Sequence, residues 1–328
     1  MAKELWQTLG PHVDTYELAV TNIVPVDSKR VQLKGRQGRF EAVLASVNEA
    51  AVKRTAGDLL AHQGQRLVQR HLKNVYQERA RRVNEGRVMY VSNVFEGRPL
   101  QVTPYDVLQA GENLGLLHTA LAEGRAELQP YRNVMHNRLG SWIESLKSAQ
   151  ELFVTERTFA RDRVRRQDTK AWSDLVDSWI DVSGRAVELL EKQGYNEWSA
   201  SKPGGIAWNG YRLSSLLRLP DGRMAVNQVS APVRDTPLYD LASLCLDVSE
   251  SGHVDGVMEA MDAYALHQPI DEDEKTMVLA FVAFPHQGLR MLHGVRTGRV
   301  NLSSDSAWKR RMEQQKSVSN RLLDKTRG

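Results

Sequence analysis

The spacing of apolar residues changes once along this chain, and that change restricts the fold more than any other feature. Up to about Phe95, apolar residues fall in short runs rich in β-branched side chains: "YELAVTNIVPV", "RVQLKG", "RFEAVLASV", "RLVQRHL" and "GRVMYVSNVF". Such runs predict strands, and "GRQG" between the second and third predicts a hairpin. One helix is expected among them, with Asn48 as its N-cap and Gly64 as its stop.

After Pro104 the spacing becomes helical. "PYDVLQAGENLGLLHTALAEG" brings apolar residues and His118 onto one helix face, and long helical patterns fill most of the remaining chain. They are interrupted by "LLRLPDGRMAVN", a hairpin whose turn holds Asp221 and Gly222. The sequence therefore predicts an α+β protein with two lobes: a β-rich lobe over 1–96 with one main helix, a hinge over 97–104, and a helical lobe over 105–328 with a central β-hairpin.

Composition excludes several classes of protein. A single cysteine, Cys245, rules out an internal disulfide framework and a cysteine-rich zinc site. The N-terminus "MAKELWQTLGPHVDTYEL" has no apolar core of a secretory signal, and no apolar run approaches the roughly 20 residues of a membrane helix. We therefore expect cytoplasmic synthesis and no membrane insertion.

The net charge of +4 is unevenly distributed. Three segments are strongly basic: Arg66–Arg87, Arg157–Arg166 and the tail Ala307–Gly328. Such clusters are typical either of solvated helix faces or of sites for phosphates, nucleic acid or acidic proteins. No aromatic residues of an RNA-binding pattern accompany them, so nucleic acid is the less favoured partner.

Several stretches carry a resemblance to a known superfamily, in the right order. They are "FEGRPLQ", "ENLGLLHTAL", the tryptophan-rich helical patterns from Trp142 to Trp179, and "LLRLPDGRMAVNQVSAPVRDTPLYDLASL". The chain resembles the kinase-like superfamily of aminoglycoside phosphotransferases and choline kinases, and within it the CotS-like bacterial spore-coat proteins. The resemblance implies a protein-kinase-like fold, with "FEGRPLQ" as the hinge between its lobes.

The superfamily's catalytic residues do not match this sequence. Its catalytic loop begins His-Gly-Asp and reaches a metal-binding Asn five residues after the Asp, and a second metal-binding Asp follows the hairpin. Aligned on "WNGYRLSS" and "LYDLA", these positions fall on Gly210, Ser215 and Gln228, which are degenerate. The phosphate-binding Lys is expected near Leu44, where there is none, and "GRQG" is not a convincing phosphate-covering loop. Asp240 matches the residue that anchors the former catalytic loop.

Other candidate residues have ordinary structural explanations. His118 fits a buried, hydrogen-bonded histidine, and Cys245 fits a buried small apolar residue. His286 and His293 give only a weak metal signal without a carboxylate beside them. Asp221 fits a turn and Asp235 fits a helix cap, although either could replace a lost catalytic carboxylate. We expect no bound metal and no cofactor.

Three functions follow as alternatives. The resemblance implies a catalytically inactive kinase-like protein that binds other proteins, such as spore-coat components or further copies of itself, during spore-coat assembly. The second alternative is an atypical small-molecule phosphotransferase. The third is a module that binds nucleic acid or an anionic surface through the basic clusters.

Overall fold

The structure is a computed structural model, and it describes residues 2–163, 166–202, 205–227, 231–300 and 307–326. Contacts divide the chain into two compact units, each described by itself. The first comprises Met1–Gln101, Leu116–Asn137 and Ile206–Arg234, and the second comprises Val102–Gly115, Arg138–Gly205 and Asp235–Gly328.

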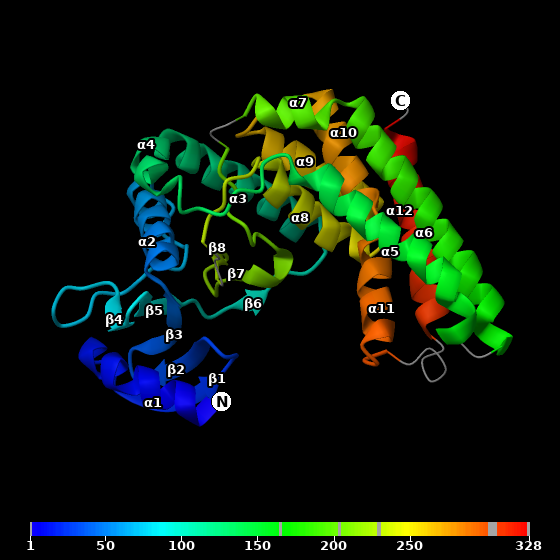
Figure 1. The fold of residues 1–328 in the computed structure, drawn as a ribbon. Helices are drawn as coiled ribbons and strands as arrows, with labels where there is room; N and C mark the ends of the chain where they lie inside the picture. Colours follow the sequence, from blue (N-terminus) through cyan, green and yellow to red (C-terminus); the bar gives the residue numbers. More distant parts are fainter. Residues whose placement is uncertain (1, 164–165, 203–204, 228–230, 301–306, 327–328) are drawn as a thin grey trace. The chain divides into compact units, whose positions relative to one another are not determined.

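An antiparallel sheet in the order β1-β2-β3-β5-β4 forms the centre of the first unit (Figure 1). Its strands are β1 (Val20–Pro25), β2 (Arg30–Gly35), β3 (Gly38–Ser46), β4 (Arg81–Asn84) and β5 (Arg87–Val94). The predicted hairpin is confirmed, because β2 and β3 pair through to Gly35 and Gly38. Strands at "RVQLKG" and "RFEAVLAS" are thus correctly placed.

A helix that the sequence reading missed covers one face of this sheet. Leu5, Leu9 and Val13 of α1 (Ala2–Val13) pack with buried residues of β2, β3 and β5, including Leu44. A short 3-10 helix, η1 (Asp14–Tyr16), then leads toward β1. The first part of the chain therefore carries two helices, where one main helix had been predicted.

The second helix, α2 (Val47–His62), covers the opposite face, where Ala50 packs with Val43 and Tyr90. Its N-cap is Ser46, whose hydroxyl accepts the Glu49 N–H at 3.1 Å, so the predicted cap at Asn48 is wrong by two residues. The predicted stop at Gly64 is confirmed, since this glycine follows the helix with φ of +87°.

The segment "RLVQRHL", predicted as a strand, is instead a strap between two sheets. On one side, the Val226 N–H donates to the Leu67 carbonyl at 2.8 Å, and the Gln69 N–H donates to the Val226 carbonyl at 3.0 Å. Toward β5, the Leu72 N–H donates to the Val91 carbonyl at 2.8 Å. The apolar pattern had indicated burial correctly, but the segment makes isolated bridges only.

The second sheet of this unit contains the predicted central hairpin. It is antiparallel in the order β6-β7-β8, with β6 (Arg98–Pro99), β7 (Leu216–Arg218) and β8 (Met224–Val226). The 3-10 helix η3 (Leu213–Ser215) directly precedes β7. Helix α4 (Arg125–Leu128), η2 (Gln129–Tyr131) and the last part of α3 (Pro104–Glu123) complete the unit.

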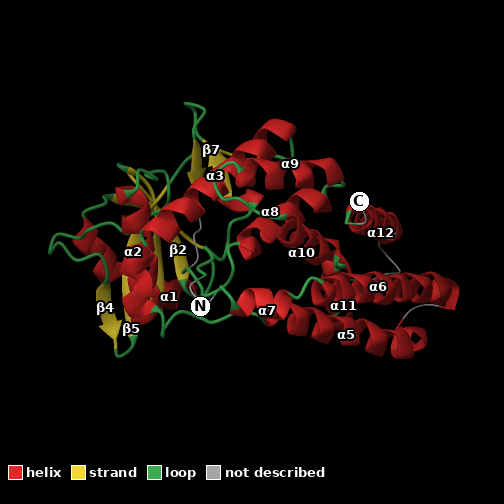
Figure 2. Ribbon diagram, turned by 90° about the horizontal axis from the view of Figure 1, so that it is seen from above, coloured by secondary structure: helices red, strands yellow, loops and turns green. Residues whose placement is uncertain are grey.

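The second unit consists of helices around an aromatic core. Apart from the first part of α3, they are α5 (Ser141–Arg163), α6 (Arg166–Lys192), α7 (Tyr195–Ala200), α8 (Leu238–Glu250), α9 (Val254–Ala265), α10 (Glu272–Ala283), α11 (His286–Arg296) and α12 (Ala307–Lys325). The long helices α5 and α6 run side by side (Figure 2). Trp172 meets Trp179 and Trp308 edge-on, with ring centroids 5.5 and 5.8 Å apart.

Glycine permits one close helix crossing in this unit. A Cβ on Gly111 of α3 would lie 2.4 Å from the Ala260 carbonyl oxygen of α9, which is too close for any side chain. Gly111 belongs to the predicted apolar face of that helix. Among the helices of the described residues, none is long and apolar enough to cross a membrane.

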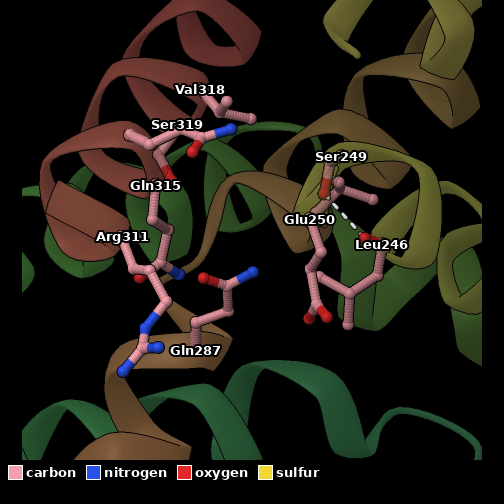
Figure 3. A pocket seen from close by; sticks show the side chains of 10 residues that line it. Leu246, Ser249, Glu250, Gln287, Arg311, Gln315, Val318 and Ser319 are labelled. Atoms are coloured by element: carbon pink, nitrogen blue, oxygen red, sulfur yellow. Dashed lines mark hydrogen bonds between the residues drawn. The ribbon is translucent and has the colours of Figure 1, made fainter. Parts of the chain in front are cut away.

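A small polar cavity of about 120 Å³ lies among α8, α10, α11 and α12 (Figure 3). The side chains of Glu250, Gln287 and Gln315 surround it, and Glu250 is ion-paired with Arg290 of α11. Its volume is below the roughly 300 Å³ at which sites for organic ligands begin.

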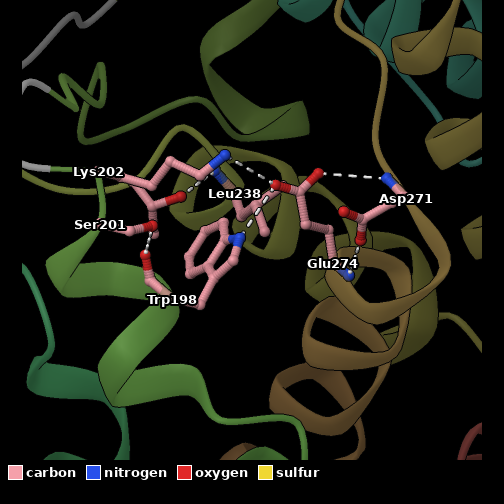
Figure 4. A network of polar contacts seen from close by, with 7 residues as sticks. Trp198, Ser201, Lys202, Leu238, Asp271 and Glu274 are labelled. Atoms are coloured by element: carbon pink, nitrogen blue, oxygen red, sulfur yellow. Dashed lines mark hydrogen bonds and ion pairs between the residues drawn. The ribbon is translucent and has the colours of Figure 1, made fainter.

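Helix α10 begins with a reciprocal capping arrangement (Figure 4). The Asp271 carboxylate accepts the Glu274 N–H at 2.8 Å, and the Glu274 carboxylate accepts the Asp271 N–H at 3.2 Å. The other Glu274 oxygen accepts the Trp198 indole N–H at 3.1 Å and lies 3.5 Å from the Lys202 ammonium. One carboxylate thus caps α10 and ties the end of α7 to it.

We predict that Asp271→Ala lowers the free energy of unfolding by about 1 kcal/mol, the usual effect of losing an N-cap. Guanidinium denaturation followed by circular dichroism would measure it. Asp273→Ala is the matched control in the same helical turn, because Asp273 does not cap α10, and it should cost only a few tenths of a kcal/mol. Equal losses in the two variants would contradict the capping role.

Candidate functional site

The loop Trp208–Ser215, aligned above with a catalytic loop, is closed by one hydroxyl. The Ser215 Oγ lies 2.7 Å from the Arg212 carbonyl oxygen and 3.1 Å from that of Gly210, and it accepts the Arg212 N–H at 3.1 Å. Ser215 is buried. Its one proton and a lone pair are therefore used within the loop, where Ser215 contacts the backbone of Gly210.

Two residues of this loop have positive φ angles. Asn209 has φ of +58° and Gly210 has φ of +153°. Asparagine tolerates the first, but the second is a region that residues with a Cβ rarely adopt. The backbone at 210 therefore suits glycine and disfavours aspartate at this position.

The hairpin that follows the loop holds Asp221 at its tip. The Asp221 carboxylate accepts the Arg223 backbone N–H at 3.0 Å and pairs with the Arg223 guanidinium at 2.6 Å. This is the turn role predicted for Asp221. Its exposed, paired carboxylate does not replace a lost catalytic group in this arrangement.

Gln228, aligned with the second metal-binding Asp, lies outside the described residues, but its neighbour Asn227 lies within them. The Asn227 N–H donates to the Ser215 carbonyl at 2.8 Å. Its side chain makes two further bonds: Oδ1 accepts the Phe95 N–H at 3.0 Å, and Nδ2 donates to the Phe95 carbonyl at 2.9 Å. Sequence reasoning had given Asn227 no role.

A cavity of about 610 Å³ lies beside this pair and is the candidate binding site of the first unit. It is bounded by β1–β3, by the segment Val94–Gly97, and by Leu217 and Asn227 of the hairpin region. Its volume falls in the range of small-molecule sites. Arg39 at its edge pairs with Glu96 at 2.9 Å, and Lys34 also lines it.

The turn between β1 and β2 borders the same side of the sheet. It contains no glycine, since residues 26–29 read "VDSK". Asp27 folds this turn by accepting the Lys29 N–H at 2.8 Å and the Arg30 Nε–H at 2.7 Å. The "GRQG" segment lies between β2 and β3. The turn between β1 and β2 is instead closed by the carboxylate of Asp27.

The α2-facing side of β3 carries a carboxylate. Glu41 is buried, lies opposite Gln32 of β2, and has its Oε1 3.7 Å from the Arg30 guanidinium. Leu44, where a lysine had been sought, instead lies in the cluster covered by α1. Val43 and Ala45 of the same strand pack with Ala50 of α2.

The buried cation on this side comes from α2. Lys53 is 8% exposed, and its ammonium donates to the Tyr90 hydroxyl at 3.1 Å. Burial lowers the pKa of Lys53 to about 8, although attraction to Glu41 and Glu49 opposes the shift. On this side of the sheet, the buried cation Lys53 therefore comes from α2 and the buried carboxylate of Glu41 comes from β3.

Two aspartates belong to the second unit. Asp240 is fully buried in the first turn of α8, and its predicted contact with the backbone near Trp208 and Asn209 stays a prediction because those residues belong to the first unit. Asp235 is also fully buried; one carboxylate oxygen accepts the Thr236 N–H at 2.8 Å and the other lies 3.8 Å from Arg138. Burial raises the pKa of Asp235 to about 7.

The remaining candidates fit their structural explanations. His118 and Cys245 are buried, and burial raises the pKa of the Cys245 thiol. His286 bonds the Phe281 carbonyl at 2.8 Å. Within the part of the chain that the structure describes, no group of three or more His, Cys, Asp or Glu side chains could hold a metal ion.

Comparisons with known proteins identify the fold. No family model matches the chain, and no curated protein matches it either. Among solved structures, it is similar to an aminoglycoside phosphotransferase from Alicyclobacillus acidocaldarius, with 18% identity, a TM-score of 0.72, and coverage of 96% of this chain and 94% of that one. A spectinomycin phosphotransferase in complex with ADP and spectinomycin gives 11% identity, a TM-score of 0.60, and coverage of 100% and 98%.

The chain therefore has the aminoglycoside phosphotransferase-like fold, and the predicted α+β class is confirmed. At these identities the likeness concerns the fold alone.

Asp235 generates a prediction about pH. Between its ordinary value of 3.8 and about 7, the folded chain keeps a proton that the unfolded chain has lost. Stability should therefore fall as pH rises through this window, by up to about 1.4 kcal/mol per pH unit, and level off above it. Asp235→Asn should flatten this slope in denaturant titrations between pH 4.5 and 7.5, whereas the exposed control Asp174→Asn should not. An unchanged slope in Asp235→Asn would refute the assignment.

Proposed function

We propose that this chain is a kinase-like protein without phosphotransferase activity, which works by binding other proteins. The observation that carries the proposal is the self-closed loop Trp208–Ser215. Phosphoryl transfer relies on positioning and on charge: a carboxylate orients the acceptor, and anionic or amide oxygens hold Mg²⁺. In this loop Gly210 offers no side chain, and the Ser215 hydroxyl is bonded to the loop's own backbone.

Electrostatics at the neighbouring cavity supports the same conclusion. A triphosphate needs cations that are not already compensated, and Mg²⁺ prefers anionic oxygen ligands. Arg30 is shared between Asp27 and Glu41, and Arg39 is paired with Glu96. Glu41 is a buried carboxylate on the α2-facing side of β3, where it compensates the charge of Arg30 and attracts Lys53. Lys34 and Arg39 are the basic residues among those that line the cavity.

The similar solved structures are named phosphotransferases, and one is described as a complex with ADP. We propose that the present chain shares their fold and has lost their chemistry. Gln228 at the second metal position and Gly210 at the catalytic position are neutral together, so one substitution alone would not restore the site. That Asp240, which is buried in α8, holds this loop in shape remains a prediction of the resemblance.

We further propose spore-coat assembly as the setting, on the strength of the resemblance to CotS-like proteins. A protein of this kind would offer its surface to other coat components or to copies of itself. Basic segments such as Ala307–Gly328 would favour acidic partners.

The first test is nucleotide binding. The wild-type protein should show no Mg²⁺-dependent rise in melting temperature with ATP, although a ligand at 100 times its dissociation constant would add about 2.7 kcal/mol. Gln228→Asp alone should not produce turnover, because Gly210 would still lack a carboxylate. ATP hydrolysis or phosphate transfer by the wild type that is lost in Ser215→Ala would overturn the proposal. Metal-independent weak binding of ATP would not, since Lys34 could hold phosphates without catalysis.

The second test is cellular. In sporulating cells of the organism that carries it, we expect a fluorescent fusion at the spore surface and the protein in coat extracts. Chemical crosslinking in those extracts should connect it to other proteins. A signal spread evenly through the mother cell, with no crosslinked partner, would contradict the coat assignment and leave the loss of catalysis to the nucleotide test.

A further inference from the structure

We infer that Asn227 is a specificity-determining residue of the 610 Å³ cavity. Its carboxamide is bonded to the N–H and C=O of Phe95. Without it, these two groups would bind a planar, uncharged ligand that has a hydrogen-bond donor beside an acceptor. The inference rests on the proposed function, because it concerns the same cavity, which we propose does not serve phosphoryl transfer. It deepens that proposal by naming which ligands the cavity excludes and which residue excludes them.

The contact itself is a closed pair. Both main-chain groups of Phe95 are bonded to the two ends of one carboxamide, at 3.0 and 2.9 Å, across 132 positions of sequence. Both residues line the cavity, and Asn227 is 7% exposed. The Asn227 backbone is held as well, because its N–H donates to the Ser215 carbonyl at 2.8 Å. The side chain is therefore fixed at the edge.

The chemistry of this edge defines the ligand class. A backbone N–H and C=O that face one partner bind a planar group with an acceptor next to a donor. A carboxamide is the smallest such group, and aromatic carboxamides, lactams and nucleobases present the same pattern. Apolar side chains of Phe40, Val94 and Leu217 line the cavity and would contact an aromatic ring.

The charged residues beside the cavity restrict the class of ligand further. Glu41 is buried on the strand opposite Gln32, and Gln32 lines the cavity. Glu41 is paired with Arg30, and Arg39 at the edge of the cavity is paired with Glu96, so we take the ligand to be neutral.

In the wild type, the hydrogen bonds between Asn227 and Phe95 should be favoured over binding of a free ligand. Asn227 is already held beside Phe95, so it competes at a high effective concentration, whereas a free ligand must lose translational freedom and displace two hydrogen bonds. Removing the carboxamide leaves the N–H and C=O of Phe95 at the cavity wall without their partner, and polar groups without a partner are costly. That cost becomes binding energy for a ligand that pairs with them.

The experiment compares two probes of nearly the same shape. Benzamide carries a carboxamide on an aromatic ring, and acetophenone keeps the ring and carbonyl but lacks the N–H donor. Isothermal titration without metal or phosphate would measure both. We expect Asn227→Ala to bind benzamide at least tenfold more tightly than the wild type does, with no such gain for acetophenone. Asn227→Leu removes the carboxamide but fills the space and should resemble the wild type.

Asn22→Ala is the matched control, since Asn22 also lines the cavity but its side-chain oxygen accepts the N–H of Ile23, and it should not gain affinity for benzamide. Equal binding by wild type and Asn227→Ala, no binding by either, or equal gains for the two probes would each overturn the inference. Should Asn227→Ala fail to fold, hydrogen exchange of the Asn227 side-chain amide in the wild type decides: slow exchange supports the closed pair, and exchange at the rate of a free amide overturns it.

These outcomes are separate from those of the proposed function. Phosphate transfer by the wild type would refute the proposed function whether or not Asn227→Ala gains benzamide. Failure of benzamide to bind the variant would refute the role of Asn227 and leave the absence of catalysis intact.

Discussion

The first unit depends on the backbone hydrogen bonds that the segment from Leu67 to Leu72 makes with two different sheets. One end of the strap pairs with β8 through Val226, and the other pairs with β5 through Val91. The five-stranded sheet and the hairpin sheet are thereby joined by main-chain bonds that do not depend on side-chain identity. Because Asn227 directly follows Val226, these bonds also help to hold the Asn227 carboxamide beside Phe95.

Local periodicity predicted most of the regular structure. Alternating residues in "RVQLKG" and "RFEAVLAS", with turn residues between them, placed β2 and β3, and helical spacing placed α3 and α8. It failed where local preference and tertiary packing disagree. Gly10 and Pro11 obscured α1, which is stabilised by burying Leu5 and Leu9 against the sheet. "RLVQRHL" has the composition of a strand, but its segment is divided between two different sheets.

The candidate site was predictable in part. That position 210 has no carboxylate and position 215 no carboxamide follows from residue identity and spacing alone. Which residue of β3 faces α2 does not, because an error of one position in register moves a side chain to the opposite face. Counting led to Leu44, whereas the charged residue on the α2 side is Glu41. The pairing of Asn227 with Phe95 had no local signal, since it joins residues 132 positions apart.

The φ angle of Gly210 has a consequence for evolutionary history. A single nucleotide change can convert a glycine codon into an aspartate codon, so at the level of the gene an aspartate at position 210 is one step away. At the level of the backbone it is further, because φ of +153° penalises any residue with a Cβ until the surrounding loop has changed as well. A variant with aspartate at position 210 would thus also need changes elsewhere in the loop before the new side chain could be tolerated.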